Sequence, residues 1–232
     1  MIYNCDPTDW KNLQDLVASI FREIGCETFT EKEIDTVRGK VEVDVYAKDN
    51  KSTPESLYIC ECKFWNKPVP KNVVHSFRTV IADSGANHGY IISKKGFQSG
   101  AYDAAINSNI TLRSWSEFQE EFFNIWNQAS IDKLSSKLRE ICRYADVEEY
   151  PDCNVSEYID NTKKGLRFSL ALWEYMEKGG NVIFPYEIKN IMNFPSNARV
   201  SFESRYELIE YTMQAANEII GKYMSLSSNS VN

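Results

Sequence analysis

The sequence is poor in the features that mark several classes of protein. It has only two histidines, and its six cysteines have no spacing typical of a disulfide framework. No apolar run approaches the length of about 20 residues that a membrane-spanning helix needs. The first ten residues also lack the basic and apolar segments of a secretory signal. We therefore expect a cytoplasmic protein with free thiols and no membrane association.

The chain also lacks an excess of positive charge. Its formal net charge is −7, which argues against a protein that coats nucleic acid electrostatically. The charge is unevenly distributed, with −1 over residues 1–115, −6 over residues 116–232 and a local +5 over residues 63–95. This basic segment is a place where a polyanion can dock. A solvated basic surface is, however, the commoner explanation of such a cluster.

The composition is that of a globular protein, with 43% hydrophobic and 13% aromatic residues. Apolar residues at helical spacing predict a helix over residues 9–24, with Asp9 as its N-cap and Gly25 at its end. A short strand follows. The alternation of valine with polar residues over 40–48 predicts another strand, which turn-forming residues connect to an antiparallel partner ending at residue 65.

The remaining segments complete an α/β pattern. Residues 70–83 and 99–108 predict helices, and residues 89–93 and 110–115 predict strands. This order predicts a mixed β-sheet flanked by helices. From residue 116 onward the chain reads as helical, with a break near 129, further helices near 160–178 and 203–223, and a disordered tail. We place a domain boundary at residue 128.

The segment YICECKFWNK, residues 58–67, contains the acidic and basic side chains of the second predicted hairpin strand. Alternation along a strand places Glu61 and Lys63 on one face and Cys60 and Cys62 on the other. Neither histidine lies at a spacing from these cysteines that is typical of zinc ligands. We therefore expect Cys60 and Cys62 to be buried thiols of the core and not a zinc site. Pairing of the two strands can bring Asp44 beside Glu61, where a divalent cation would relieve their repulsion. From the spacing alone, a surface salt bridge made by Lys63 is the commoner explanation.

The order of these parts resembles the PD-(D/E)xK nuclease superfamily, and within it the Mrr-like restriction endonuclease domain. The resemblance covers roughly residues 10–115 and rests on four segments: LQDLVASIFREIGCETF, GKVEVDVYAKDN, YICECKFW and GYIISKKGFQSGAYDAAINSNITL. It implies a restriction-endonuclease-like mixed sheet within a nuclease domain over residues 1–128. Residues 129–232 would then form an α-helical region for partner binding, dimerisation or regulation.

The resemblance also implies the site. Asp44, Glu61 and Lys63 would be the catalytic residues, and Asp44, Glu61 and the Cys62 carbonyl would bind Mg²⁺, with Mn²⁺ able to substitute. Relatives often have Glu in the first helix where this chain has Gln14, which leaves the number of metal ions open. Candidates for contact with the nucleic-acid backbone are Lys67, Lys71, Arg78, Lys94 and Lys95, and further residues lining the site are Gln14, Ser93 and Gln98.

These implications predict a magnesium-dependent DNA endonuclease acting in restriction or anti-phage defence. One alternative is a catalytically silent PD-(D/E)xK fold that serves as an interaction subunit of a larger complex. The sequence also leaves RNA open as a substrate, because no separate nucleic-acid-binding motif decides between the two. In the helical region, Phe168, Leu172, Trp173 and Met176 have the spacing of a core or of a dimer face.

Overall fold

The computed structural model describes residues 1–144, 184, 186–187 and 201–229. They divide into two compact units, which we describe separately. One unit is Cys5–Trp126, and the other combines Met1–Asn4 with the chain from Asn127 onward. The helix predicted near 160–178, with its proposed dimer face, lies outside the described residues. The functional division that we placed at residue 128 stays a prediction.

The elements of the first unit follow the predicted order. They are α1 (Trp10–Glu23), β1 (Glu27–Thr36), β2 (Gly39–Asp49), β3 (Ser56–Lys63), α2 (Lys71–Ser84), β4 (His88–Ser93), α3 (Ser99–Ala105), β5 (Ile110–Ser114) and the beginning of α4 (Trp115–Tyr144). Asp9 caps α1 as predicted, because its carboxylate accepts the backbone N–H of Asn12 at 2.8 Å. Gly25 follows the helix with a φ of 95°, a conformation that glycine adopts without strain.

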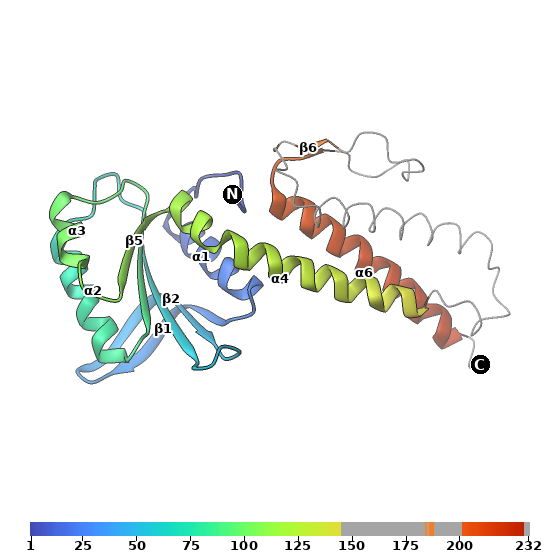
Figure 1. Ribbon diagram of the computed structural model, residues 1–232, viewed down its shortest axis with the longest axis horizontal. Coiled ribbons are helices and arrows are strands. Elements are labelled where there is room, and N and C mark those ends of the chain that lie inside the picture. Colours follow the sequence, from blue (N-terminus) through green and yellow to red (C-terminus); the bar gives the residue numbers. More distant parts are fainter. Residues whose placement is uncertain (145–183, 185, 188–200, 230–232) are drawn as a thin grey trace. The chain divides into compact units, whose positions relative to one another are not determined.

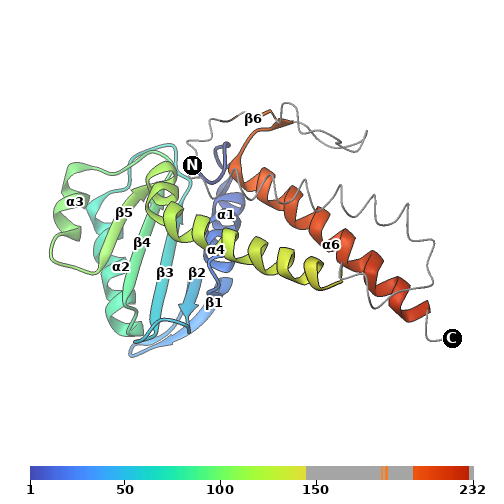
Figure 2. The same ribbon diagram turned by 45° about the vertical axis from the view of Figure 1, so that its right-hand side comes forward.

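The five strands form one mixed sheet in the order β1-β2-β3-β4-β5 (Figure 2). β1, β2 and β3 pair antiparallel as consecutive hairpins, whereas β3, β4 and β5 pair parallel. The parallel pairs need crossover connections, which α2 and α3 provide. The sheet confirms the predicted α/β fold, and it places the middle of β2 beside the end of β3.

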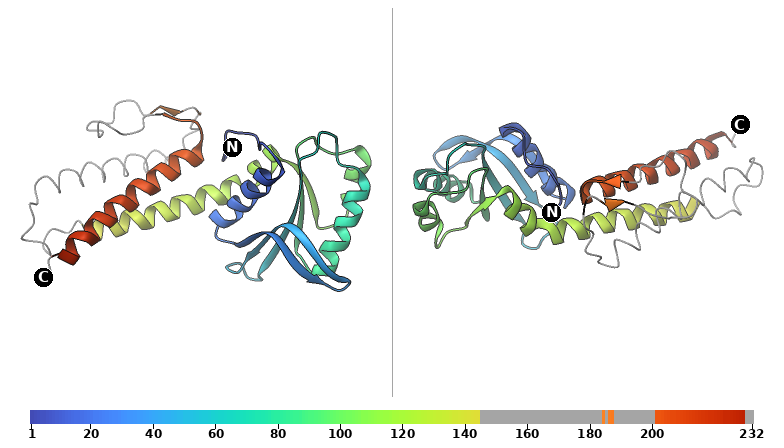
Figure 3. Two further views of the ribbon diagram at one scale, coloured as in Figure 1. Left: turned by 180° about the vertical axis from the view of Figure 1, so that it is seen from behind. Right: turned by 90° about the horizontal axis from the view of Figure 1, so that it is seen from above.

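Helices cover both faces of this sheet (Figures 1 and 3). On one face, α2 and α3 enclose a core that includes Ile59, Phe77, Ile81 and Ile91. On the other face, α1 and the beginning of α4 pack an aromatic cluster against the sheet. Its members are Phe21, Tyr58, Tyr90, Phe118 and Phe122, with ring centroids 4.7–6.4 Å apart in their contacting pairs.

The hairpin departs from the simple alternation that we expected. Valines 41, 43 and 45 should share one face of β2, and Tyr46 should lie on the other. Instead Val43 packs in the α2-side core, and Tyr46 packs against that core from the same side. Val45 pairs with Cys60 on the opposite face. At the same level of the sheet, Glu31 of β1 has a φ of 51° between the pairs Thr30↔Val45 and Lys32↔Val43. Asp44 lies opposite Glu31.

Gly89 in β4 provides a test of the packing between the sheet and α2. A Cβ at this position would lie 2.7 Å and 2.9 Å from Ile81 side-chain carbons and 3.1 Å from Phe77. We expect Gly89→Ala to lower the free energy of unfolding by about 1–3 kcal/mol because the extra methyl overpacks the core. Gly100→Ala is the matched control, since a Cβ there meets Lys71 at an ordinary 3.6 Å. Urea unfolding of the two variants measures the difference, and equal stability would contradict the close contact.

In the second unit, α4 continues to Tyr144 without the break predicted near 129, and Gln128 donates to Asp132 across one helical turn at 2.9 Å. A short antiparallel pair joins β6 (Tyr186–Glu187) to β7 (Ser201–Phe202), and α6 (Arg205–Asn229) follows. α6 thus extends into the segment that we expected to be disordered. No helix in the described ranges has the length and apolar character needed to cross a membrane.

Candidate functional site

Asp44 is held against the neighbouring strand by its own carboxylate. It directly precedes Val45, which pairs with Cys60 of β3. The backbone N–H of Cys62 donates to Oδ2 of Asp44 at 2.6 Å. A backbone N–H bonded to a charged acceptor is among the stronger hydrogen bonds in proteins. The bond therefore fixes the half-buried Asp44 carboxylate beside β3, within reach of the Glu61 position.

Glu61 and Lys63 form an ion pair on β3. Their side chains are only 25% and 17% exposed. Burial raises the pKa of Glu61 above its usual value, and the negative charge of Asp44 raises it further, while Lys63 acts in the opposite direction. The two carboxylates therefore lie near enough to repel each other. The structure brings Asp44, Glu61 and Lys63 together as predicted, but their catalytic and metal-binding roles stay predictions.

α1 and β1 add Lys11 and Glu31, which sequence reasoning missed, beside the predicted Gln14. Lys11 donates to Glu31 at 2.9 Å and to Oε1 of Gln14 at 3.3 Å. The bond to Glu31 is the main cause of a raised pKa for Lys11, and the charge of Asp44 is a smaller cause. Gln14 is fully buried, and its Nε2 has no hydrogen-bond partner among the described residues. The positive φ of Glu31 carries no sequence signal, because only tertiary structure imposes this conformation on glutamate.

The cysteines of β3 belong to the core. Cys60 and Cys62 are fully buried and free, and burial raises the pKa of both thiols well above the usual value. Cys26 behaves in the same way, with a pKa raised to about 11 mainly by burial. Thiols that stay protonated are poor zinc ligands. In the part of the chain that the structure describes, no three His, Cys, Asp or Glu side chains are grouped so as to hold a metal ion.

The predicted nucleic-acid contacts fall into two groups. Lys67, Lys71, Lys94 and Lys95 have exposed side chains. Arg78 is exposed as well, but its guanidinium donates to the carbonyl of Ala104 at 3.1 Å and so ties α2 to α3. This bond gives Arg78 a structural role that its place in the basic segment did not indicate.

The two polar residues predicted near the end of β4 also differ. Ser93 is buried, and its hydroxyl donates to the carbonyl of Gly96 at 2.9 Å, which shapes the loop before α3. Gln98 is exposed, and its backbone N–H donates to the carbonyl of Val69 at 3.0 Å. The backbone N–H of Lys94 donates to the carbonyl of Lys63 at 3.1 Å. The end of β4 is therefore fastened directly to the lysine of the site.

This combination of sheet order, carboxylates and lysine can be compared with known proteins. The model of the Mrr catalytic-domain family, described as a restriction endonuclease, matches residues 5–122. The chain belongs to this family. The Mrr family is part of the PD-(D/E)xK nuclease superfamily. Its matched range corresponds closely to the Cys5–Trp126 unit.

The other comparisons add little to the Mrr assignment. A solved structure of a protein of unknown function, AF1548, has 18% sequence identity and a TM-score of 0.42, covering 92% of this chain and 100% of that chain. No curated protein matches the sequence. The membership of the Mrr family therefore rests on the family model.

Proposed function

We propose that the protein is a magnesium-dependent DNA endonuclease. The observation that carries this proposal is the joined arrangement of Asp44, Glu61 and Lys63, in which the backbone of β3 holds Asp44 and the Lys63 ammonium pairs with Glu61. A surface salt bridge would explain the ion pair but not a second carboxylate that raises the pKa of Glu61. Two buried carboxylates repel each other, and a bound cation would offset this repulsion.

The residues present fit a hard divalent cation. Asp44 and Glu61 would hold it, with the Cys62 carbonyl as a further oxygen ligand. Mg²⁺ suits such a site because it binds through one or two carboxylates and keeps several waters. When bound there, Mg²⁺ or Mn²⁺ supplies Lewis-acid chemistry and lowers the pKa of bound water.

The chain's own residues would orient the reaction. Lys63 would hold the attacking water and stabilise charge on the phosphate as the P–O bond to water forms and the P–O3′ bond breaks. The ion pair with Glu61 keeps the Lys63 ammonium in position. Exposed Lys67, Lys71, Lys94 and Lys95 would contact phosphates without reading sequence. Such contacts would make DNA binding sensitive to salt.

A cleavage assay tests the function. The protein is incubated with plasmid, linear and single-stranded DNA and with RNA, in the presence of Mg²⁺, Mn²⁺ or EDTA. We expect plasmid nicking or linearisation with either metal and none with EDTA. Cleavage of RNA alone would move the proposal to the RNA-directed alternative. The absence of cleavage in every condition would support the catalytically silent alternative.

A stability measurement tests the electrostatics of Glu61. Its raised pKa means that the folded state resists ionisation of this carboxyl. The free energy of unfolding therefore falls as the pH rises from the ordinary glutamate pKa to the raised pKa of the folded state, and below the ordinary pKa Glu61 does not lower it. We therefore expect Glu61→Gln to stabilise the protein at about pH 8 by roughly 0.5–1 kcal/mol. The difference should vanish near pH 4, below the usual glutamate pKa of about 4.3. Thermal unfolding of both proteins at the two pH values measures it.

The companion measurement adds metal. Mg²⁺ should raise the melting temperature of the wild type at about pH 8 and should have a smaller effect on Glu61→Gln, because a ligand stabilises the state that binds it. If Glu61→Gln were less stable than the wild type at this pH, the Lys63 pair would outweigh the repulsion from Asp44. The pair would then be a structural salt bridge.

We further propose that residues 129–232 bind a partner or a second copy of the chain, and that the protein acts in restriction or anti-phage defence in the cytoplasm. The division of the described residues into two units supports a separate role for this region. Light scattering on the full chain would distinguish a monomer from a dimer.

A further inference from the structure

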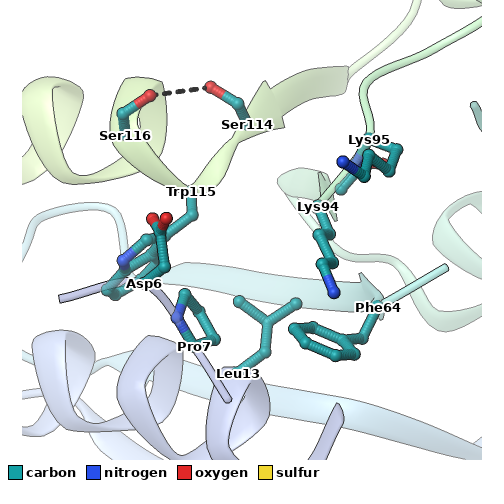
Figure 4. Close-up of a pocket in the computed structure, with 10 residues that line it drawn as sticks. Asp6, Pro7, Leu13, Phe64, Lys94, Lys95, Ser114, Trp115 and Ser116 are labelled. Atoms are coloured by element: carbon teal, nitrogen blue, oxygen red, sulfur yellow. Dashed lines mark hydrogen bonds between the residues drawn. The ribbon is translucent and has the colours of Figure 1, made fainter. Parts of the chain in front are cut away.

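A cavity lies at the carboxyl ends of the parallel strands β3, β4 and β5 (Figure 4). It encloses about 210 Å³, and it shares none of its lining side chains with Asp44, Glu61 and Lys63. Every residue that lines it belongs to the Cys5–Trp126 unit. Phe64, which follows Lys63 directly in the chain, forms part of its wall. The cavity is thus a neighbour of the proposed catalytic residues and is separate from them.

One side of the cavity is basic. Lys94 and Lys95 both line it, and the Lys94 ammonium lies 3.9 Å from the centre of the Phe64 ring. A cation over an aromatic face is held in place while its remaining N–H groups stay available. The hydroxyls of Ser114 and Ser116 lie 3.1 Å apart at the same cavity and bond to each other.

The beginning of α4 does not supply the binding groups. The backbone N–H and the hydroxyl of Ser114 already bind Oε2 of Glu117, at 2.7 Å and 2.8 Å. An anion in this cavity would therefore depend on the two lysines and not on the helix end. This dependence makes the lysines the decisive residues for a test.

The other side of the cavity combines apolar walls with one carboxylate. Pro7, Leu13 and Phe64 provide the walls, and Asp6 lies beside Trp115 (Figure 4). The Trp115 indole is buried and donates to the carbonyl of Cys5 at 3.2 Å, which fixes the ring next to Asp6. Apolar walls beside the Asp6 carboxylate, which can accept hydrogen bonds, suit a heterocyclic base that carries an amino group.

We propose that this cavity binds one nucleotide. The phosphate would lie against Lys94 and Lys95, and the base would lie against Pro7 and Leu13 with its amino group directed to Asp6. Two ammonium groups match the charge of a phosphate monoester. The volume is below the roughly 300–1,000 Å³ of pockets for drug-sized ligands, so it limits the ligand to about one nucleotide. A free mononucleotide and the phosphorylated end of a nucleic-acid strand share this chemistry.

Isothermal titration calorimetry of the full chain with deoxyadenosine monophosphate tests the proposal. We expect binding that is about 10-fold or more weakened in Lys94→Ala and in Lys95→Gln, because each loses a charge-assisted hydrogen bond. Lys40→Ala is the matched control, since it removes the same charge from an exposed lysine on β2 and should bind as the wild type does. Inorganic phosphate and deoxyadenosine, which each fill one side of the cavity, should both bind more weakly.

Two comparisons separate this proposal from the proposed nuclease and identify the source of the nucleotide. Asp44→Asn should bind deoxyadenosine monophosphate normally even if it does not cleave DNA. A single-stranded oligonucleotide that competes only when it is 5′-phosphorylated would identify a strand end as the ligand, and competition by neither form would identify a free nucleotide. No binding at millimolar concentration, or equal weakening in Lys94→Ala and Lys40→Ala, would overturn the proposal.

Discussion

Asp44→Asn is expected to lower the rate of DNA cleavage by a factor of about 10²–10³ or more, the cost of removing one electrostatic group from an active site. The amide keeps an oxygen that can accept the backbone N–H of Cys62, so the hairpin should remain intact. What it loses is the charge that a divalent cation requires. Lys63→Ala should have an effect of similar size, because it removes the ammonium that we propose to stabilise the reacting phosphate. Initial rates of plasmid cleavage at saturating Mg²⁺ measure both.

The control for this pair lies on the same hairpin. Asp35→Asn removes an equal charge from an exposed residue of β1 that pairs with Lys40, away from the proposed site. Its cleavage rate should equal that of the wild type. Cleavage that survives in Asp44→Asn would show that the activity resides elsewhere in the chain, even if the protein is a nuclease. Thermal unfolding of all three variants confirms that each is folded.

Phe118→Ala is expected to lower the free energy of unfolding of the nuclease unit by about 3–5 kcal/mol, as the loss of a buried phenylalanine does in other cores. Phe118 is fully buried, and its ring contacts those of Phe21, Tyr90, Trp115 and Phe122 at centroid distances of 4.7–6.4 Å. Its removal would therefore leave a cavity where α1, α4 and the sheet meet. Urea unfolding followed by circular dichroism measures the loss.

Ile125→Ala is the matched control for Phe118→Ala. Ile125 lies on the same helix, but it is 58% exposed. Its truncation should change stability by no more than about 0.5 kcal/mol, the usual range for surface substitutions. A similar loss in both variants would mean that α4 contributes through its helical length and not through the aromatic cluster.

The sequence was sufficient for the order of elements because each has a strong local signal. The stripe of α1 with its Asp9 cap, and the apolar β4 between two helices, are read directly from residue spacing. The pairing of β2 with β3 followed from the turn between them. It placed Asp44 beside Glu61, although the bond from Cys62 that holds Asp44 depends on three-dimensional register.

What could not be predicted depends on contacts between distant residues. The positive φ of Glu31 in β1 has no glycine to indicate it in the sequence. The burial of Gln14 and the bond from Arg78 to Ala104 arise only when helices pack on the sheet or on each other. The uninterrupted α4 shows the same limit, because Asn127, Ser130 and Asp132 are weak helix formers that a long helix can nonetheless include.

Among the cysteines whose side chains the structure describes, Cys5 is exposed, whereas Cys26, Cys60 and Cys62 are buried. This difference makes Cys5 a natural attachment point for a thiol-reactive fluorophore once Cys142 and Cys153 have been replaced by serine. The carbonyl of Cys5 accepts the Trp115 indole N–H, and the next residue is Asp6. A dye at this position would therefore sit at the rim of the strand-end cavity. Its emission would report ligand entry in real time, and the buried Cys26, Cys60 and Cys62 would not need to be replaced because the dye cannot reach them.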